Sequence, residues 1–173
     1  GISFAYFSSK YGHAGQVREG GGRYFDHPKG AAWISVDELG GRDPETIIDI
    51  LLHDMSEDAY LLSGYRISLN FGQNVALDVR ALTKLPKGKE STEKYLARII
   101  ARGARAILTK LIDRLHNLRT LDGCTAEKRA RQIAETRNFH LKLLIPALVA
   151  CGDPWATYAP LLQLKMEEAM AGQ

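Results

Sequence analysis

The sequence predicts an all-α protein, a compact bundle of about eight helices with non-parallel packing. Apolar residues recur at helical spacing in most segments, and no stretch alternates β-branched and polar residues as a half-buried strand would. At 173 residues the chain suits one domain and leaves little room for two. We therefore expect a single domain over 1–173, closed at its C-terminal end by a helix over 155–170.

The clearest helical pattern runs over 105–121, where apolar side chains recur at i, i+4, i+8 and i+11, as on a core-facing helix. A strongly apolar helix is expected over 45–63, because Asp43 and Pro44 form a suitable N-cap and first-turn pair. The remaining helices are expected over 2–13, 28–39, 73–84, 92–102 and 126–150, the last of them bent or ended near Pro146.

Two longer loops are expected between these helices. The first, over 14–26, carries three successive glycines, and the second, over 85–91, is polar and basic. Such composition is typical of connections that run over the surface of a protein and carry binding residues.

The composition excludes several classes of protein. Apolar residues make up 45% and charged residues 25%, which is typical of a globular domain, and the net charge of +3 is too small to indicate nucleic acid. No apolar run approaches the ~18 residues that span a bilayer, and no signal peptide is evident. Cys124 and Cys151 lack metal or disulfide spacing, which indicates free thiols in a reducing compartment. We therefore expect a cytoplasmic protein with no membrane, DNA or RNA partner.

Four metal-ligating side chains stand in otherwise apolar surroundings. His53 and Asp54 are adjacent within LLHDMSED, His27 ends the glycine-rich loop, and Asp113 lies within KLIDRLHN. Burying a lone carboxylate is costly, and one shared divalent metal would satisfy all four groups. Two imidazoles and two carboxylates form a mixed nitrogen and oxygen set, suited to Mn²⁺, Fe²⁺, Co²⁺ or Zn²⁺ rather than Ca²⁺. Taken alone, a His-Asp dipeptide in a helix is more often a surface or structural feature.

Two further carboxylates follow the dipeptide at helical spacing. Glu57 is at i+4 from His53, and Asp58 is at i+4 from Asp54, so on a helix each shares a face with its partner. A carboxylate one turn from a metal can accept or donate a proton during hydrolysis. The alternative interpretation is a solvated acidic turn.

The helix that carries Asp113 also presents a polar stripe. Asn117 and Thr120 follow Asp113 at i+4 and i+7, and an amide there could contact a base, ribose or phosphate. The same segment carries cations that could bind phosphate: Lys110, Arg114 and Arg119. The alternative interpretation is an ordinary solvated helix face.

Four stretches occur together in one order: GHAGQVREGGGRYFDHP, LLHDMSED, FGQNVALDVRALTKL and KLIDRLHNLRTL. In this set the chain resembles the hydrolase domain of RelA/SpoT-type enzymes and the free-standing small alarmone hydrolases, within the HD-domain metal-dependent phosphohydrolases. The likeness covers roughly residues 3–146. It implies a helical fold that holds one Mn²⁺ and removes the 3′-pyrophosphate of guanosine tetra- or pentaphosphate, the alarmones of the stringent response. The products would be GDP or GTP and pyrophosphate.

The resemblance also implies roles for individual residues. The metal ligands would be His27, His53, Asp54 and Asp113, and the catalytic pair would be Glu57 and Asp58. The substrate would be a small nucleotide. Its binding residues would include Arg18, Tyr24 and Asn117, to which the polar helix face adds Arg119 and Thr120.

The chain departs from the family pattern at three points. Glu19 stands where the family commonly has Lys or Arg, and Gly103 stands where it usually has Asp. Glu19 is expected to oppose a polyanionic substrate by repulsion, with pairing to Arg18 or Arg23 as the alternative. Nothing after residue 146 offers room for a synthetase domain, so a hydrolase-only protein or an excised fragment is expected.

Two other functions fit part of the same pattern. One is hydrolysis of another 3′-phosphorylated purine nucleotide or of NADPH, which an assay over a nucleotide panel would distinguish. The other is a catalytically quiet module that senses nucleotides, which has no need for all six metal and catalytic residues. The sequence leaves room for a homo-oligomer.

Overall fold

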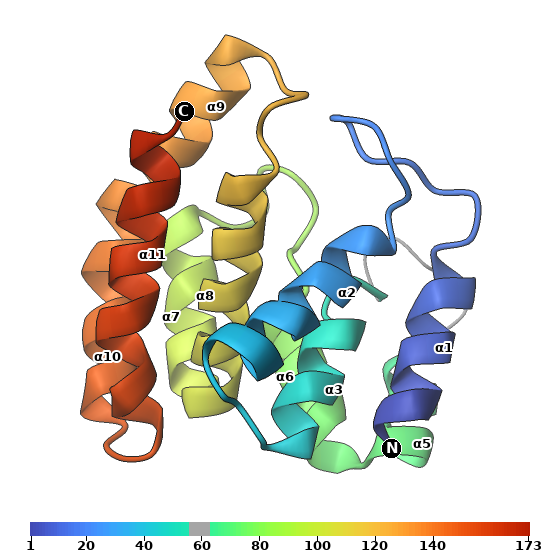
Figure 1. The fold of residues 1–173 in the computed structure, drawn as a ribbon. Helices are drawn as coiled ribbons and strands as arrows, with labels where there is room; N and C mark the ends of the chain where they lie inside the picture. Colours follow the sequence, from blue (N-terminus) through green and yellow to red (C-terminus); the bar gives the residue numbers. More distant parts are fainter. Residues whose placement is uncertain (56–62) are drawn as a thin grey trace.

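Helices make up the regular structure of the described chain, and the predicted all-α class is confirmed (Figure 1). This computed structural model describes residues 1–55 and 63–173. Within those ranges there is no strand, and one isolated antiparallel bridge joins Val17 to Arg23 in the glycine-rich loop. The α-helices are α1 (Ile2–Gly12), α2 (Asp26–Trp33), α3 (Pro44–Leu52), α5 (Gly64–Phe71), α6 (Gln73–Leu82), α7 (Thr92–Arg102), α8 (Ala104–Arg119), α9 (Ala126–Glu135), α10 (Ile145–Ala150) and α11 (Ala159–Ala171).

Shorter helical segments connect some of these helices. A π-helical turn, Ile34–Glu38, extends α2, and a 3₁₀ turn, Trp155–Tyr158, leads into α11. A longer π-helical segment, Thr136–Leu144, joins α9 to α10, so the helix expected over 126–150 runs through without ending. Pro146 causes no break; it is the second residue of α10, directly after the π-helical segment.

Two predicted elements differ from the structure. The helix expected over 45–63 ends at Leu52, and His53 with Asp54 forms a turn, after which 56–62 lie outside the described residues. Helix α5 was not predicted. It begins with a glycine after the N-cap Ser63, and its apolar residues recur at every second position, which is not the spacing that signals a helix.

Helix α8 forms the centre of the molecule. It packs against α2, α3, α6, α7 and α11, and its buried residues include a continuous run over 106–115. A helix that is buried on all sides lies inside the core rather than on its edge. Its polar side chains therefore need partners inside the protein.

Two apolar clusters meet at α2. The larger surrounds α8 and includes residues from α7, α10 and α11, whereas the smaller joins α1, α3, α5 and α6. Ala32 of α2 packs against both clusters. The junction of α2, the end of α3 and the middle of α8 therefore holds its side chains between two rigid cores.

The C-terminal helix α11 completes the larger cluster. Its buried residues Leu162, Met166 and Met170 share that cluster with α8, against which α11 packs. Figure 1 shows α11 beside α10 and α8, on the side of the molecule away from α1. Among the described residues, none of the helices has the length and apolarity that crossing a bilayer requires.

A buried group of charged residues links α3, α6, α7 and α8; we call it the arginine cluster. Asp49 and Asp78 are buried carboxylates, and Arg105 lies between them, with Nη2 at 2.7 Å from Asp78 and Nε at 3.4 Å from Asp49. Arg102 Nε lies 2.7 Å from the second oxygen of Asp78, and Glu45 pairs with Arg105. Arg102 and Arg105 thus face the buried Asp78 carboxylate from both of its oxygens.

Candidate metal centre

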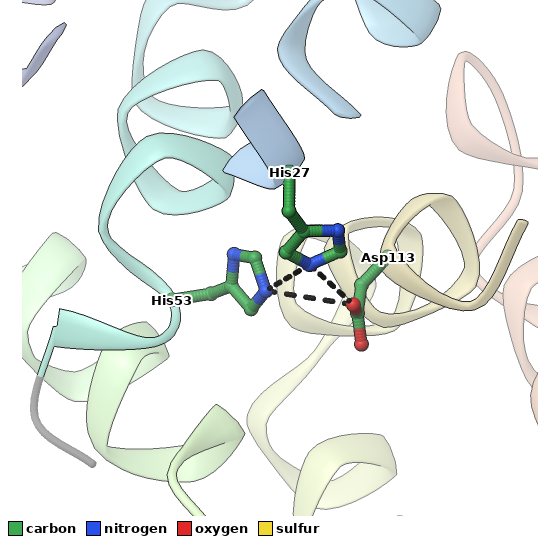
Figure 2. A group of neighbouring side chains, drawn as sticks. All are labelled: His27, His53 and Asp113. Carbon is green, nitrogen blue, oxygen red and sulfur yellow. Dashed lines mark hydrogen bonds and ion pairs between the residues drawn. The ribbon is translucent and has the colours of Figure 1, made fainter. Parts of the chain in front are cut away.

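Three side chains from three separate segments converge on one point (Figure 2). His27 stands in the first turn of α2, His53 caps the end of α3, and Asp113 lies midway along α8. All three are buried, and one potential ligand atom of each lies within 4.8 Å of the others. The His27 Nε2 atom is 3.3 Å from His53 Nε2 and 3.0 Å from Asp113 Oδ1, which in turn is 3.5 Å from His53 Nε2.

Asp54 brings a fourth donor to the same point. Its Oδ2 atom lies 3.0 Å from His53 Nε2 and 3.6 Å from His27 Nε2. The structure therefore brings together the four predicted metal ligands, which we call the metal centre. The turn that follows α3 makes this possible, because it aims two consecutive side chains at the same point.

A backbone hydrogen bond fixes which nitrogen of His53 faces the metal centre. His53 Nδ1 lies 2.7 Å from the carbonyl oxygen of Ile50 and must donate to it, so a neutral His53 presents a lone pair at Nε2. That lone pair faces the second imidazole nitrogen and two carboxylate oxygens. Four electron-rich atoms directed at one another repel unless a cation lies between them. This donor set therefore fits a bound divalent metal.

The pKa directions of the two histidines show the same excess of negative charge. Burial disfavours the charged form of His53, yet the Asp54 and Asp113 carboxylates outweigh it and hold its pKa well above the ordinary value. Burial lowers the pKa of His27, and Asp113 offsets this only in part. The His53 charge also disfavours a second proton on His27. The Asp54 and Asp113 carboxylates thus favour a positive charge on one of the two imidazoles, and a charge on both is disfavoured.

A second histidine layer orients His27. Its Nδ1 atom lies 2.8 Å from His116 Nδ1, and burial lowers the pKa of His116 to about 3, so His116 is neutral. A neutral His116 can accept the His27 proton at Nδ1, and in that tautomer His27 Nε2 faces the metal centre without a proton. Gly30 makes room for this ring, since a Cβ there would lie 2.3 Å from His116 Nε2.

Sequence reasoning missed His116. The available signal was its position three residues after Asp113 on one helix, which places both side chains on the same face. Asp113 itself is held by two neighbours on α8. Asn117 Nδ2 donates to its Oδ1 and Lys110 Nζ to its Oδ2, each at 2.7 Å.

A cavity of about 290 Å³ opens beside the metal centre and is lined by three of the predicted substrate-binding residues: Arg18, Tyr24 and Asn117. The Arg18 guanidinium donates to Asn117 Oδ1 at 2.6 Å, which links the glycine-rich loop to α8. The Tyr24 hydroxyl donates to Asp54 Oδ2 at 3.0 Å, so it contacts a predicted metal ligand.

Arg119 and Thr120 line a neighbouring cavity of about 380 Å³ instead. The Arg119 guanidinium binds the Glu38 carboxylate at 2.6 and 3.0 Å, and this contact, with Lys165, lowers the pKa of Glu38 to about 2. The Thr120 hydroxyl donates to the carbonyl oxygen of His116 at 3.0 Å. The two cavities share Arg18, Glu19, His27 and Lys128 among their lining residues.

Two of the three departures from the family pattern have structural explanations. Glu19 pairs with Lys128 at the start of α9, and not with Arg18 or Arg23, the partners considered as the alternative to repulsion of the substrate. Arg23 is bound instead by Asp26, at 2.9 Å. Gly103 forms the joint between α7 and α8 with φ at 120°, a conformation that favours glycine. The predicted catalytic residues Glu57 and Asp58 lie outside the described residues.

Comparison with known proteins agrees with this geometry. A family model described as HD domain matches residues 5–139. Guanosine-3′,5′-bis(diphosphate) 3′-pyrophosphohydrolase of Aquifex aeolicus is 40% identical over 147 residues, which cover 82% of this chain and 21% of that protein. A GTP pyrophosphokinase of Myxococcus xanthus is 39% identical over 153 residues, which cover 82% of this chain and 20% of that protein. The chain thus spans about a fifth of the length of these curated relatives.

A solved structure matches over almost the whole chain. It is described as a metazoan ortholog of SpoT that hydrolyzes ppGpp and plays a role in starvation responses. The TM-score is 0.75 at 25% identity, and the match covers 99% of this chain and 94% of that one. The chain is therefore similar to the long relatives in one part of their length and to the solved chain over nearly all of its length.

Proposed function

The chain belongs to the HD domain family, and on that premise we propose that it is a metal-dependent (p)ppGpp hydrolase. The reaction would remove the 3′-pyrophosphate of guanosine tetra- or pentaphosphate and release GDP or GTP with pyrophosphate. The observation that carries this proposal is the convergence of four electron-rich donors beside a cavity rich in cations. The similarity to proteins named for this hydrolysis supports it. We also propose that 1–173 act as a single HD-type hydrolase domain.

We propose His27, His53, Asp54 and Asp113 as the ligands and Mn²⁺ as the ion, since the donor set mixes nitrogen and oxygen. When bound, a divalent ion supplies Lewis-acid chemistry by polarising a phosphoryl oxygen and easing the deprotonation of water. His116 and Asn117 contribute by fixing the orientation of His27 and Asp113. Tyr24 does the same for Asp54.

The reaction requires two proton movements that protein groups must handle. An oxygen of water bonds to the phosphorus next to the ribose 3′ oxygen, and the bond from that phosphorus to the 3′ oxygen breaks. One proton leaves the water, and one is delivered to the departing 3′ oxygen. We propose Glu57 and Asp58 for these transfers, because they are carboxylates that follow the proposed ligands His53 and Asp54 closely in the chain, and a carboxylate can accept or donate a proton.

The remaining proposed roles concern the nucleotide. Arg18 lines both cavities, and its guanidinium is oriented by Asn117, which suits it to an anionic or planar part of the substrate. Arg119 and Thr120 line the neighbouring cavity, where the part of the nucleotide away from the reacting phosphate would lie.

The test is to incubate the purified protein with Mn²⁺ and ppGpp and to identify the products by anion-exchange chromatography and ³¹P NMR. We expect GDP and pyrophosphate in equal amounts. Release of orthophosphate, or the absence of turnover, would contradict the proposal. A panel that includes other 3′-phosphorylated purine nucleotides and NADPH would define the substrate.

A further inference from the structure

The cationic side chains that line the cavity beside the metal centre fall into two groups. Among the described residues, five cationic side chains line it against three carboxylates. Arg18 and Lys128 also line the neighbouring cavity, whereas Lys84, Lys110 and Arg114 do not. The second group therefore lies on the part of the cavity away from the proposed nucleoside side. We call it the basic wall.

Tyr95 of α7 holds two members of the basic wall together. The Lys84 ammonium lies 5.7 Å from the centre of the Tyr95 ring, and the Lys110 ammonium lies 5.4 Å from it. A cation is attracted to an aromatic face at this distance, which keeps two like charges near one another. The charge of Lys110 is the main cause that lowers the pKa of Lys84. This repulsion would be relieved by an anion placed between the two lysines.

Arg114 is held rigidly from behind. Its Nε donates to His140 Nε2 at 3.2 Å, its Nη2 lies 3.2 Å from Glu135, and its Nη1 bonds to Gln132. Burial lowers the pKa of His140 to about 2, so this ring is neutral and accepts the bond. These contacts use three of the five N–H groups of the Arg114 guanidinium, and they hold that group in one orientation at the surface of the cavity.

One carboxylate separates the basic wall from the metal centre. Asp113 turns Oδ1 toward the two imidazoles, while its Oδ2 accepts from Lys110 at 2.7 Å. Lys110, Asp113 and Arg114 share one turn of α8, so the two regions are a few ångströms apart. An anion with two linked phosphates can reach both regions at once, whereas a single phosphate can reach one.

From this arrangement we infer that Lys84, Lys110 and Arg114 form a second anion subsite, which takes the terminal phosphate of a diphosphate whose first phosphate lies at the metal centre. The inference rests on the proposed function for the identity of the substrate. It assigns the basic wall to the leaving pyrophosphate, and it makes a 3′-diphosphate preferred over a 3′-monophosphate.

The test measures binding without turnover. Inorganic pyrophosphate and orthophosphate are titrated calorimetrically into the protein at one fixed free Mn²⁺ concentration and ionic strength. Lys84 is the residue to change, because it is exposed and its loss leaves the core intact. Lys89→Ala is the matched control, since Lys89 is an exposed lysine of the same loop that does not line the cavity.

We expect the wild type to bind pyrophosphate more tightly than orthophosphate. Lys84→Ala should weaken pyrophosphate binding about ten-fold, the scale of one charged hydrogen bond, and leave orthophosphate binding unchanged. Lys84→Glu should weaken it further, and Lys89→Ala should match the wild type. Equal affinity of the wild type for both anions, or wild-type pyrophosphate affinity in Lys84→Ala, overturns the inference.

The two proposals fail in different ways. A protein that does not hydrolyse ppGpp, yet prefers pyrophosphate through Lys84, contradicts the proposed reaction and supports the subsite. A protein that hydrolyses ppGpp, while Lys84→Ala binds pyrophosphate like the wild type, supports the reaction and overturns the subsite.

Discussion

The metal centre and the arginine cluster are both groups of buried charged side chains in apolar helices, yet their charges are balanced differently. In the arginine cluster, Arg102 and Arg105 supply the positive charge that Asp78 requires, and burial beside Asp78 raises the pKa of Asp49 so that it keeps a proton. In the metal centre, by contrast, two imidazoles face two carboxylates. The positive charge between them must come from a proton on an imidazole or from a bound ion. The comparison teaches that a buried charged residue marks a ligand site only where the protein leaves its charge uncompensated.

The largest expected effect separates the two regions by metal content. Asp113→Ala removes the carboxylate that faces both imidazoles, so we expect loss of the bound ion and at least a roughly thousand-fold loss of hydrolysis. Asp78→Ala, in the arginine cluster, should keep one ion per folded chain. Metal analysis by mass spectrometry after gel filtration checks both variants. Full metal occupancy in Asp113→Ala would rule out its role as a ligand.

The second effect concerns stability. Arg105→Ala leaves the buried Asp78 carboxylate with Arg102 as its remaining cation, so we expect a loss of about 3 kcal/mol in the free energy of unfolding. Lys165→Ala removes a partner of Glu38 nearer the surface and should cost about 1 kcal/mol or less. Urea denaturation measures both changes. Equal losses would show that the arginine cluster does not stabilise the fold as described.

The third effect tests the layer behind the metal centre. His116→Ala removes the acceptor that orients His27, so we expect metal affinity to fall about 10–100-fold, the usual scale for groups behind the ligands. Calorimetric titration with Mn²⁺ measures this change. His116→Gln keeps an acceptor and should recover part of the affinity. Unchanged affinity in His116→Ala would mean that the contact does not orient His27.

The smallest effect concerns the pH dependence of the arginine cluster. Burial and the charge of Asp78 raise the pKa of Asp49 to about 10, so the folded protein keeps a proton that the unfolded chain releases near pH 4. Stability is therefore highest below pH 4 with respect to this group and falls as the pH rises toward the folded pKa. Asp49→Asn should remove this fall and add about 1–3 kcal/mol at pH 8. Unfolding measured from pH 5 to pH 9 checks the slope, and equal slopes in both proteins would contradict it.

The sequence predicts the helices with dense apolar stripes better than the sparse ones. α8 is predicted almost to its ends because apolar side chains recur along its whole length, whereas α5 buries only Ile67 and gives no stripe. The end of α3 is also missed, because no glycine or proline follows Leu52 closely to signal it. Apolar spacing reports burial, and it reports helix ends poorly.

The sequence predicts the potential metal ligands of the candidate site better than it predicts the residues around them. Asp49 is as buried in an apolar helix as Asp113 is, and the pattern of residues alone does not separate a structural carboxylate from a ligand. Partners that are remote in sequence distinguish the two carboxylates: Asp49 lies beside Arg105, whereas Asp113 faces His27 and His53. Such contacts between remote segments depend on packing, which residue spacing does not encode.

The most direct test of the central claim is a crystal structure of the protein grown with Mn²⁺, with anomalous diffraction measured near the manganese edge. We expect one anomalous peak per chain, within about 2.5 Å of His27 Nε2, His53 Nε2 and an oxygen of Asp113. No peak should lie in the arginine cluster, which holds its own cations. A structure at full Mn²⁺ saturation with no peak between the two imidazoles, or with a peak elsewhere, would contradict the assignment of the metal centre.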